Sequence, residues 1–372
     1  MEWQNGIQDY TKKYNRFTEV LLRKFATKEN GNILLSPFSI LMLLAIAADA
    51  TSGKTREEIA NVLSNSMRFE EVRDLLCKLQ RVITVKDILA SANALCVSHR
   101  IKADILPEYP ANLKTRFGGD LFASESIVED VNNWVSEKTN GLIPQILNAP
   151  ISDETAAFLL NAVSFKADWH VKFEEELIAP EKFENAGGTT VEMLMLHGTE
   201  KSYIEDENIT GFVKPYKEEY SFMALLPKEK GRDALMKTLE RTDFTELFYK
   251  KTNADVSMAM PEFRYSFEKN MTETCKVLGI HKLFENDADF SPMTTTALKA
   301  GSIFHKAHIE LDRKGTKAAA VTGMGIMLAS CVIMGERKKV YLTRPFIYAI
   351  IHNKTGLPVF TGVLNRVEKK NS

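Results

Sequence analysis

Residues 48–55 have the spacing that comes closest to a nucleotide-binding motif. They read Ala-Asp-Ala-Thr-Ser-Gly-Lys-Thr, a relaxed phosphate-binding loop with alanine in place of its first glycine. Such a loop needs a preceding strand and enough glycine for backbone N–H groups to converge on an anion. Here Ser36-Pro37 predicts the capped start of a helix over the apolar run that ends at Ala50, and the loop has a single glycine. The pattern therefore favours a turn between two helices, the second capped by Thr55, over a nucleotide site.

Two of the seven histidines, His305 and His308, lie three apart, which is the spacing of a metal-binding pair on a helix. The residues around them alternate between apolar and polar as in a strand, so the two rings are predicted on opposite faces of a sheet. We therefore expect a hydrogen-bonded, structural role for His305. The chain contains neither HExxH nor GxSxG, and its four cysteines have no metal-ligand spacing, which favours free thiols. No enzymatic activity, metal or cofactor is predicted.

The composition excludes several classes of protein. The chain has 372 residues, with 48 Lys and Arg against 49 Asp and Glu, so it lacks the basic excess that favours nucleic-acid binding. Hydrophobic residues make up 44%, enough for a large globular core. The first residues lack the apolar stretch of a signal peptide, so the chain is either cytosolic or secreted and supplied without its leader. We expect an extracellular or cell-surface protein, with no nucleic acid or membrane as partner.

The predicted elements change in character along the chain. The first third has helical periodicity, as over residues 8–26, whereas from about Ala156 short strand-like segments alternate with polar turns. Helical windows recur around residues 233–246 and 267–278. No linker, repeat or block of charge marks a boundary. The sequence therefore predicts one intertwined α+β domain over residues 1–372.

Residues 318–334 contain no charged side chain. At about 17 residues this run approaches the length of a membrane span, but its first half consists mostly of small residues, and predicted strands flank it. Alternate residues from Thr316 to Leu328 form a face that is small at first and apolar later. Small side chains allow a segment to slide between existing strands without displacing core groups. The pattern therefore predicts a loop that is able to become a strand.

Several ordered segments, spread over nearly the whole chain, resemble the serpin family. The matching segments are NILLSPFSILMLLAIAADATSGKTREEI, VNNWVSEKTNGLIPQIL, LLNAVSFKADWHVKF, HKAHIELDRKGTKAAA and RPFIYAIIHNKTGLPVFTGVLNR. The resemblance implies the serpin fold, an α+β fold in which eight to nine helices surround three β-sheets. It also implies an exposed, mobile reactive-centre loop at about residues 313–340, which inhibits serine proteases by inserting into the main sheet.

The resemblance assigns roles to residues by their position. Ser36, Ser39, Asn161 and His305 match the polar cluster known as the shutter, under the point where the main sheet opens. Trp169 matches the aromatic residue at the top of that sheet, the breach. The part of the loop that inserts first, the hinge, matches Gly315, Thr316, Lys317, Ala318, Ala319, Ala320, Val321 and Thr322. Small hinge residues are typical of inhibitory serpins, and the alternative is a non-inhibitory serpin such as a carrier or chaperone.

Two charges in the predicted breach depart from the family pattern. Arg313 stands where the family usually has Glu, two residues before Gly315, and Glu262 stands where many members have the basic partner of that Glu. We hypothesise an inverted Arg313–Glu262 ion pair beside the point where the loop inserts. Lys317 also replaces a usual Glu, but on the outward face, where we expect little effect.

The position of the reactive bond follows from that of the hinge. In the family, the residue before this bond lies fourteen residues beyond the hinge glycine, which places the bond between Ala329 and Ser330. A small residue before the bond suits elastase-like proteases, with subtilisin-like ones as further candidates, whereas trypsin-like proteases require Lys or Arg there. Cleavage after Leu328 is the alternative and would favour a chymotrypsin-like protease.

The implied mechanism is suicide inhibition. The serine of the protease attacks the Ala329 carbonyl, and the freed loop then inserts as a new strand and distorts the protease before the acyl-enzyme is hydrolysed. The product is a covalent 1:1 complex with the protease. The resemblance further implies a monomer with a metastable native state, able to form loop–sheet polymers.

Overall fold

The computed structural model describes residues 2–64, 67–85, 88–148, 157–316 and 337–368, with side chains from Tyr10 onward. The chain separates into two compact units, each assembled from three stretches. The first comprises Met1–Lys13, Ser36–Ser164 and Ser266–His308, and the second comprises Tyr14–Leu35, Phe165–Tyr265 and Ile309–Ser372. The expectation of one domain over the whole chain stays a prediction. No helix in the described part of the chain is both long and apolar enough to span a bilayer.

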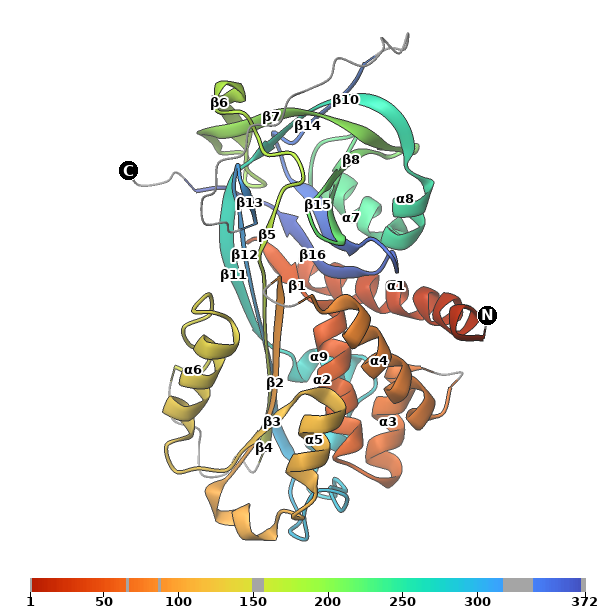
Figure 1. Ribbon diagram of the computed structural model, residues 1–372, viewed down its shortest axis with the longest axis vertical. Coiled ribbons are helices and arrows are strands. Elements are labelled where there is room, and N and C mark those ends of the chain that lie inside the picture. Colours follow the sequence, from red (N-terminus) through yellow and green to blue (C-terminus); the bar gives the residue numbers. More distant parts are fainter. Residues whose placement is uncertain (1, 65–66, 86–87, 149–156, 317–336, 369–372) are drawn as a thin grey trace. The chain divides into compact units, whose positions relative to one another are not determined.

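Helices surround the sheet of the first unit (Figure 1). They are the start of α1 (Glu2–Lys28), α2 (Pro37–Asp49), α3 (Gly53–Leu63), α4 (Phe69–Ile83), α5 (Tyr109–Phe117), α6 (Ile127–Lys138) and α9 (Thr272–Val277), with the 3-10 helices η1 (His99–Asp104) and η3 (Lys282–Phe284). The strands are β2 (Leu89–Val97), β3 (Asp120–Phe122), β4 (Ala157–Phe165), β11 (Phe263–Asn270) and β12 (Ala300–Leu311). The order β3-β2-β4-β12 is extended by β11, which pairs with β12.

Helix α2 begins where the sequence predicts. Ser36 is its N-cap, because its side chain accepts a hydrogen bond from the Ser39 N–H at 3.4 Å. All of its residues are buried, as expected for a helix that is apolar on every side. Helix α3 starts at Gly53 rather than after Thr55, because the Thr55 hydroxyl instead accepts the backbone N–H of Asp289 at 3.1 Å. The segment that resembles a phosphate-binding loop is thus the expected junction of two helices.

The sheet of the first unit is covered on both faces. Strands β4 and β12 are parallel and pair from Ala157↔Ala300 to Ser164↔His308. Helix α6 packs on one face through Val131, Trp134 and Val135, and α2 lies on the other (Figure 1). Strands buried on both faces explain the continuous apolar runs that the sequence shows here.

The second unit is built on a sheet of order β1-β16-β15-β9-β8-β7-β10-β14, with β6 paired to β7. The strands of this sheet are β1 (Ile33–Leu35), β6 (Ile178–Glu184), β7 (Thr190–Glu205), β8 (Ile209–Pro215), β9 (Tyr220–Pro227), β10 (Thr252–Pro261), β14 (Lys338–Tyr341), β15 (Phe346–His352) and β16 (Pro358–Leu364). The unit also contains β5 (Ala167–Asp168) and β13 (Gly315–Thr316), which pair with each other, and β13 pairs with the end of β12. Its helices are the end of α1, η2 (Glu175–Leu177), α7 (Arg232–Arg241) and α8 (Phe244–Lys250).

The described strands join into two hydrogen-bonded sheets rather than three separate ones. The cause is the long strand β7, which pairs with β6 along its first half, with β8 along its last residues and with β10 along much of its length. One strand therefore connects groups of strands that would otherwise count as two sheets. The α+β class expected from the sequence is confirmed.

Candidate functional site

A buried row of polar side chains crosses three neighbouring strands of the first unit. Asn93 lies on β2, Asn161 on β4 and His305 on β12, and His305 is directly opposite Asn161 in the strand register. The Asn161 amide donates to Asn93 Oδ1 at 2.9 Å, and Asn161 Oδ1 lies 2.7 Å from His305 Nδ1. At the other side of the ring, the Ser36 N–H donates to His305 Nε2 at 3.3 Å. The row therefore ties the start of α2 to the centre of the sheet.

These partners determine where His305 carries its proton. Nε2 accepts the Ser36 N–H and is therefore unprotonated, so Nδ1 donates to the Asn161 oxygen. Burial lowers the pKa of His305 to about 3. The ring is thus neutral and structural, as the sequence predicts. The alternation of β12 places His308 on the opposite face, where its Nδ1 lies 2.8 Å from Ser266 Oγ.

All four residues of the predicted shutter are joined by hydrogen bonds. Ser36 Oγ donates to Ser39 Oγ at 3.0 Å, and Ser39 Oγ lies 3.3 Å from the hydroxyl of Ser91. Ser91 and Asn93 were not predicted from the sequence. Their spacing in the sequence could have indicated them. Both are polar, they lie two residues apart in a mostly apolar strand, and they therefore point to the same face.

The first two residues of the predicted hinge, Gly315 and Thr316, form β13 in the second unit. This short strand lies between β12 and β5, with Thr316 paired to Leu311 on one side and to Ala167 on the other. Both hinge residues are buried. A Cβ on Gly315 would lie 2.6 Å from the Cα of Asp168, so only glycine allows this approach of two backbones.

The remaining predicted loop residues lie outside the described part of the chain. They include the rest of the hinge (Lys317, Ala318, Ala319, Ala320, Val321 and Thr322), the reactive bond between Ala329 and Ser330, and the alternative at Leu328. The described chain resumes at Arg337, before β14, which pairs in parallel with β10.

Trp169, the predicted breach aromatic, is fully buried against the hinge segment. Its backbone N–H donates to the Lys314 carbonyl at 3.0 Å, and its indole N–H donates to the Asp312 carbonyl at 2.9 Å. The indole stacks on Tyr216 with ring centroids 4.3 Å apart. The Tyr216 hydroxyl in turn lies 2.8 Å from Thr316 Oγ1. Trp169 and its stacking partner thus contact the chain on both sides of the hinge glycine.

A buried cation lies beside this aromatic cluster. Lys214 Nζ lies 4.5 Å from the Phe173 ring centroid and 5.4 Å from that of Trp169. It also forms a 2.8 Å ion pair with Glu200, whose pKa burial raises. Their side chains are only 5% and 12% exposed, so water screens this ion pair little. Neither residue could be predicted from the sequence, because a single Lys or Glu in a strand forms no motif.

The expected ion pair between Arg313 and Glu262 is present. Arg313 Nε lies 3.0 Å from Glu262 Oε1, and the Arg313 backbone N–H donates to the same oxygen at 3.3 Å. A second carboxylate, that of Glu175 on η2, lies 2.5 Å from Arg313 Nη1. Hydrogen bonding to Glu262 is the main cause that raises the pKa of Arg313. The Glu262 side chain is 8% exposed and that of Glu175 is 66% exposed, so water screens the outer contact more than the inner one.

Sequence comparison identifies the family. A family model described as Serpin (serine protease inhibitor) matches residues 12–367. The chain belongs to the serpin family. Among the curated relatives of this serpin, Iripin-2 of Ixodes ricinus is 29% identical, covering 98% of this chain and 95% of that protein. Leukocyte elastase inhibitor A of Mus musculus is 30% identical, covering 89% and 92%.

Solved structures agree with this assignment. The thermophilic serpin tengpin in its native state matches with a TM-score of 0.86 at 30% identity, covering 98% of this serpin and 94% of that chain. Human thyroxine-binding globulin also matches with a TM-score of 0.86, at 23% identity and with 98% and 100% coverage. At that identity the second match shows the fold alone. The serpin fold expected from the sequence is confirmed.

Proposed function

We propose that this serpin inhibits serine proteases by suicide-substrate trapping, with Ala329 before the reactive bond and Ser330 after it. The observation that carries the proposal is the position of β13. Gly315 and Thr316 already occupy a strand position between β12 and β5. The residues that follow can therefore extend an existing strand, so insertion does not have to begin with the separation of two paired strands at this point.

Insertion in this proposal continues the pairing that β13 begins. Thr316 pairs antiparallel with Leu311, so the register brings Ala318 to Ile309 and Ala320 to Ala307 along β12. The same register brings Thr322 to His305, which requires the His305–Asn161 hydrogen bond to open. Small residues at these positions limit the displacement of core side chains. The shutter residues would thereby regulate how readily β4 and β12 separate.

The proposed target is an elastase-like protease, held in a covalent 1:1 complex. Support comes from the small side chain of Ala329 and from relatives named leukocyte elastase inhibitor in Mus musculus and Xenopus laevis, at 30% and 29% identity. Subtilisin-like proteases accept the same residue, and cleavage after Leu328 would favour a chymotrypsin-like target.

Incubation with pancreatic elastase tests the proposal. We expect a band on a denaturing gel with the combined mass of protease and serpin, together with loss of elastase activity. Elastase with its active-site serine blocked is the matched control and should give no such band, because the bond forms through that serine. Mass spectrometry of the released peptide distinguishes cleavage after Ala329 from cleavage after Leu328. Cleaved serpin beside fully active elastase would contradict inhibition and favour a carrier or chaperone.

A further inference from the structure

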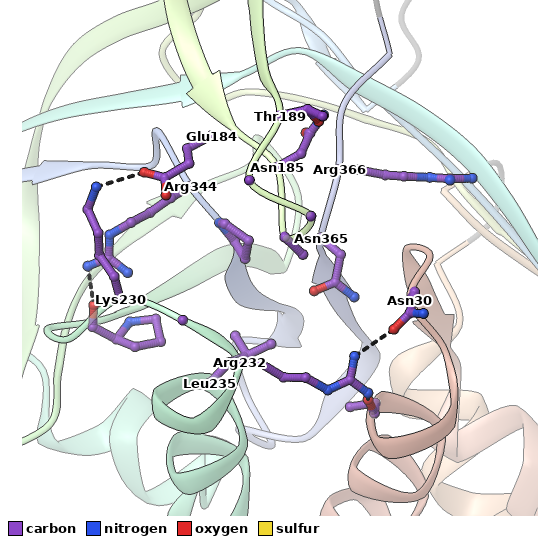
Figure 2. Close-up of a pocket in the computed structure, with 17 residues that line it drawn as sticks. Asn30, Glu184, Asn185, Thr189, Lys230, Arg232, Leu235, Arg344, Asn365 and Arg366 are labelled. Carbon is purple, nitrogen blue, oxygen red and sulfur yellow. Dashed lines mark hydrogen bonds and ion pairs between the residues drawn. The ribbon is translucent and has the colours of Figure 1, made fainter.

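A pocket of about 550 Å³ lies in the second unit (Figure 2). It is formed by the end of α1, the turn between β6 and β7, the start of α7 and the segment that follows β14. This volume is within the usual range of small-molecule sites. None of the hinge, breach or shutter residues lines it. A ligand here would therefore bind independently of the proposed protease inhibition.

Positive charge dominates the lining. Lys230, Arg232, Arg344 and Arg366 line the pocket, whereas Glu184 is the single carboxylate among the lining residues. Glu184 forms an ion pair with Lys230 at 2.7 Å. Arg366 points away from the other cations in Figure 2 and lies 3.8 Å from the carboxylate of Glu368, so we assign it no role.

The two remaining arginines are held by uncharged oxygens. Arg232 donates to two backbone carbonyls at the end of α1, both at 2.8 Å, and to Asn30 Oδ1 at 2.7 Å. Arg344 donates to the three successive carbonyls of residues 227–229. Each guanidinium has five N–H donors, so two on each remain for a ligand. These partners carry no charge, so they fix both side chains in place without neutralising Arg232, whereas Arg344 is balanced in part by Glu184, which also pairs with Lys230.

The cations occupy two separate ends of the pocket. Figure 2 shows Arg232 reaching toward Asn30 on one side, whereas Lys230 and Arg344 lie together with Glu184 on the other. Each end therefore carries an excess of about one positive charge. Leu235 on α7 lies between the two ends, and the amide of Asn365 lies on the side of Arg232 (Figure 2). The lining thus combines two cationic ends with a partly apolar middle.

We propose that this pocket binds a small dicarboxylic acid, with one carboxylate at Arg232, the other at Arg344 and Lys230, and its carbon chain against Leu235. A carboxylate carries one negative charge, which matches the excess at each end better than a phosphate monoester with nearly two. The free N–H groups of a guanidinium form charge-assisted hydrogen bonds with carboxylate oxygens. Gly231, the N-cap of α7, also lines the pocket, and the helix dipole adds positive potential there.

Isothermal titration with unbranched α,ω-dicarboxylic acids of increasing length tests this assignment on the intact chain. We expect one chain length to bind best, because only one length matches the separation of the two ends. That acid should bind about tenfold more tightly than the monocarboxylic acid of the same length. Once its first carboxylate is bound, the carbon chain holds the second at a high effective concentration near the other end of the pocket. Equal affinity of the two acids at every length, or equal binding of acetate, would overturn the proposal and indicate adventitious anion binding only.

Variants locate the site. Arg232→Gln and Arg344→Gln should each reduce the affinity of the best dicarboxylate to that of its monocarboxylate. Arg241→Gln, an equal charge change at the other end of α7, should leave the affinity unchanged. Equal weakening by Arg241→Gln would overturn the assignment.

Arg344→Gln also removes hydrogen bonds to the backbone, so it perturbs the local fold as well as the pocket. A second pair of variants, at Gly187, tests the pocket without removing any such bond. Gly187 lines the pocket, and a Cβ there meets no atom within 4 Å. We expect Gly187→Asp to weaken dicarboxylate binding by about tenfold through charge repulsion, and the isosteric Gly187→Asn to leave it unchanged. Equal effects of the two substitutions would contradict an anion site.

Discussion

At the scale of single residues, His305 has no place for a second proton in the native protein. Its Nε2 accepts the Ser36 N–H, so protonation there would bring two donors face to face. Burial lowers its pKa from 6.5 to about 3. The unfolded chain therefore takes up a proton as the pH falls below about 6.5, whereas the native chain does so only near pH 3. Stability is lost across this window, by up to about 1.4 kcal/mol per pH unit.

The substitution His305→Gln should remove this pH dependence. At pH 7.5 we expect the variant to unfold at a lower urea concentration than the wild type, because it loses hydrogen bonds in the buried row. At pH 4.5 the gap between the two midpoints should shrink, since the wild type has lost the contribution of its neutral ring. The control is Thr190→Gln, at an exposed position with no titratable side chain, for which the gap to the wild type should not shrink. A gap for His305→Gln that is equal at both pH values would contradict the role of burial.

A second residue-scale prediction concerns the ion pair of the breach. Exposed pairs contribute about 0–1 kcal/mol and partly buried ones more, and Glu262 is the buried partner here. Either single reversal, Arg313→Glu or Glu262→Lys, should lower the thermal midpoint. The double reversal should restore most of it but not all, because Glu175 then faces a like charge. Adding Glu175→Lys should recover more of it but still not all, because the backbone N–H of Arg313 has lost the oxygen of Glu262 as its acceptor.

Thermal melting of the four variants checks this expectation. The difference between the double and the triple variant measures the outer contact with Glu175 separately. Losses that add in the double reversal would show that Arg313 and Glu262 do not stabilise each other.

At the scale of elements, β13 is a short strand with partners on both sides. Thr316 is fully buried in it and its hydroxyl lies 2.8 Å from that of Tyr216. Thr316→Arg would bury an unpaired charge at this point, which costs several kcal/mol. The buried charge therefore favours a native state in which β13 has left the sheet. Under the proposed mechanism the loop then inserts more slowly, so the acyl-enzyme has time to hydrolyse and the serpin becomes a substrate.

The measurement for Thr316→Arg is the stoichiometry of elastase inhibition. We expect the number of serpin molecules consumed per inhibited protease to rise at least about tenfold. Thr190→Arg, at an exposed position of β7, is the matched control and should leave the stoichiometry unchanged. An unchanged value for Thr316→Arg would rule out insertion through β13.

At the scale of the whole molecule, the proposed mechanism requires a native state that is not the most stable one. Strands β4 and β12 share a single hydrogen-bonded ladder. A strand inserted between them replaces that ladder with two, so the cleaved chain gains backbone hydrogen bonds and buried apolar surface. Under this mechanism the uncleaved form persists only if a barrier separates it from the inserted one.

Cleavage of the loop should therefore raise the thermal midpoint. We expect serpin cut between residues 328 and 330 to unfold at a higher temperature than the intact chain. Cut Thr316→Arg should gain less, because its hinge does not insert readily. Circular dichroism during heating measures both. A midpoint that cleavage leaves unchanged would contradict metastability.

Local patterns in the sequence determined much of the fold and part of the candidate site. The cap at Ser36 and the apolar run after it predicted α2, and the alternation around His305 predicted a strand with its two histidines on opposite faces. These features were accessible because a periodicity or a cap is visible in the residues themselves. The ion pair of Arg313 and Glu262, 51 positions apart, was predicted only through the resemblance to serpins.

Only the tertiary structure decided which distant residues complete these sites. Glu175 reaches Arg313 across 138 positions of sequence, and Arg232 reaches Asn30 across 202. The same applies to Lys214 beside Trp169 and to the placement of Gly315 between two strands. Such contacts leave no local pattern, because any exposed Glu or Arg satisfies the sequence rules equally well. Chain topology selects among them, by bringing separate strands and helix ends to the same place.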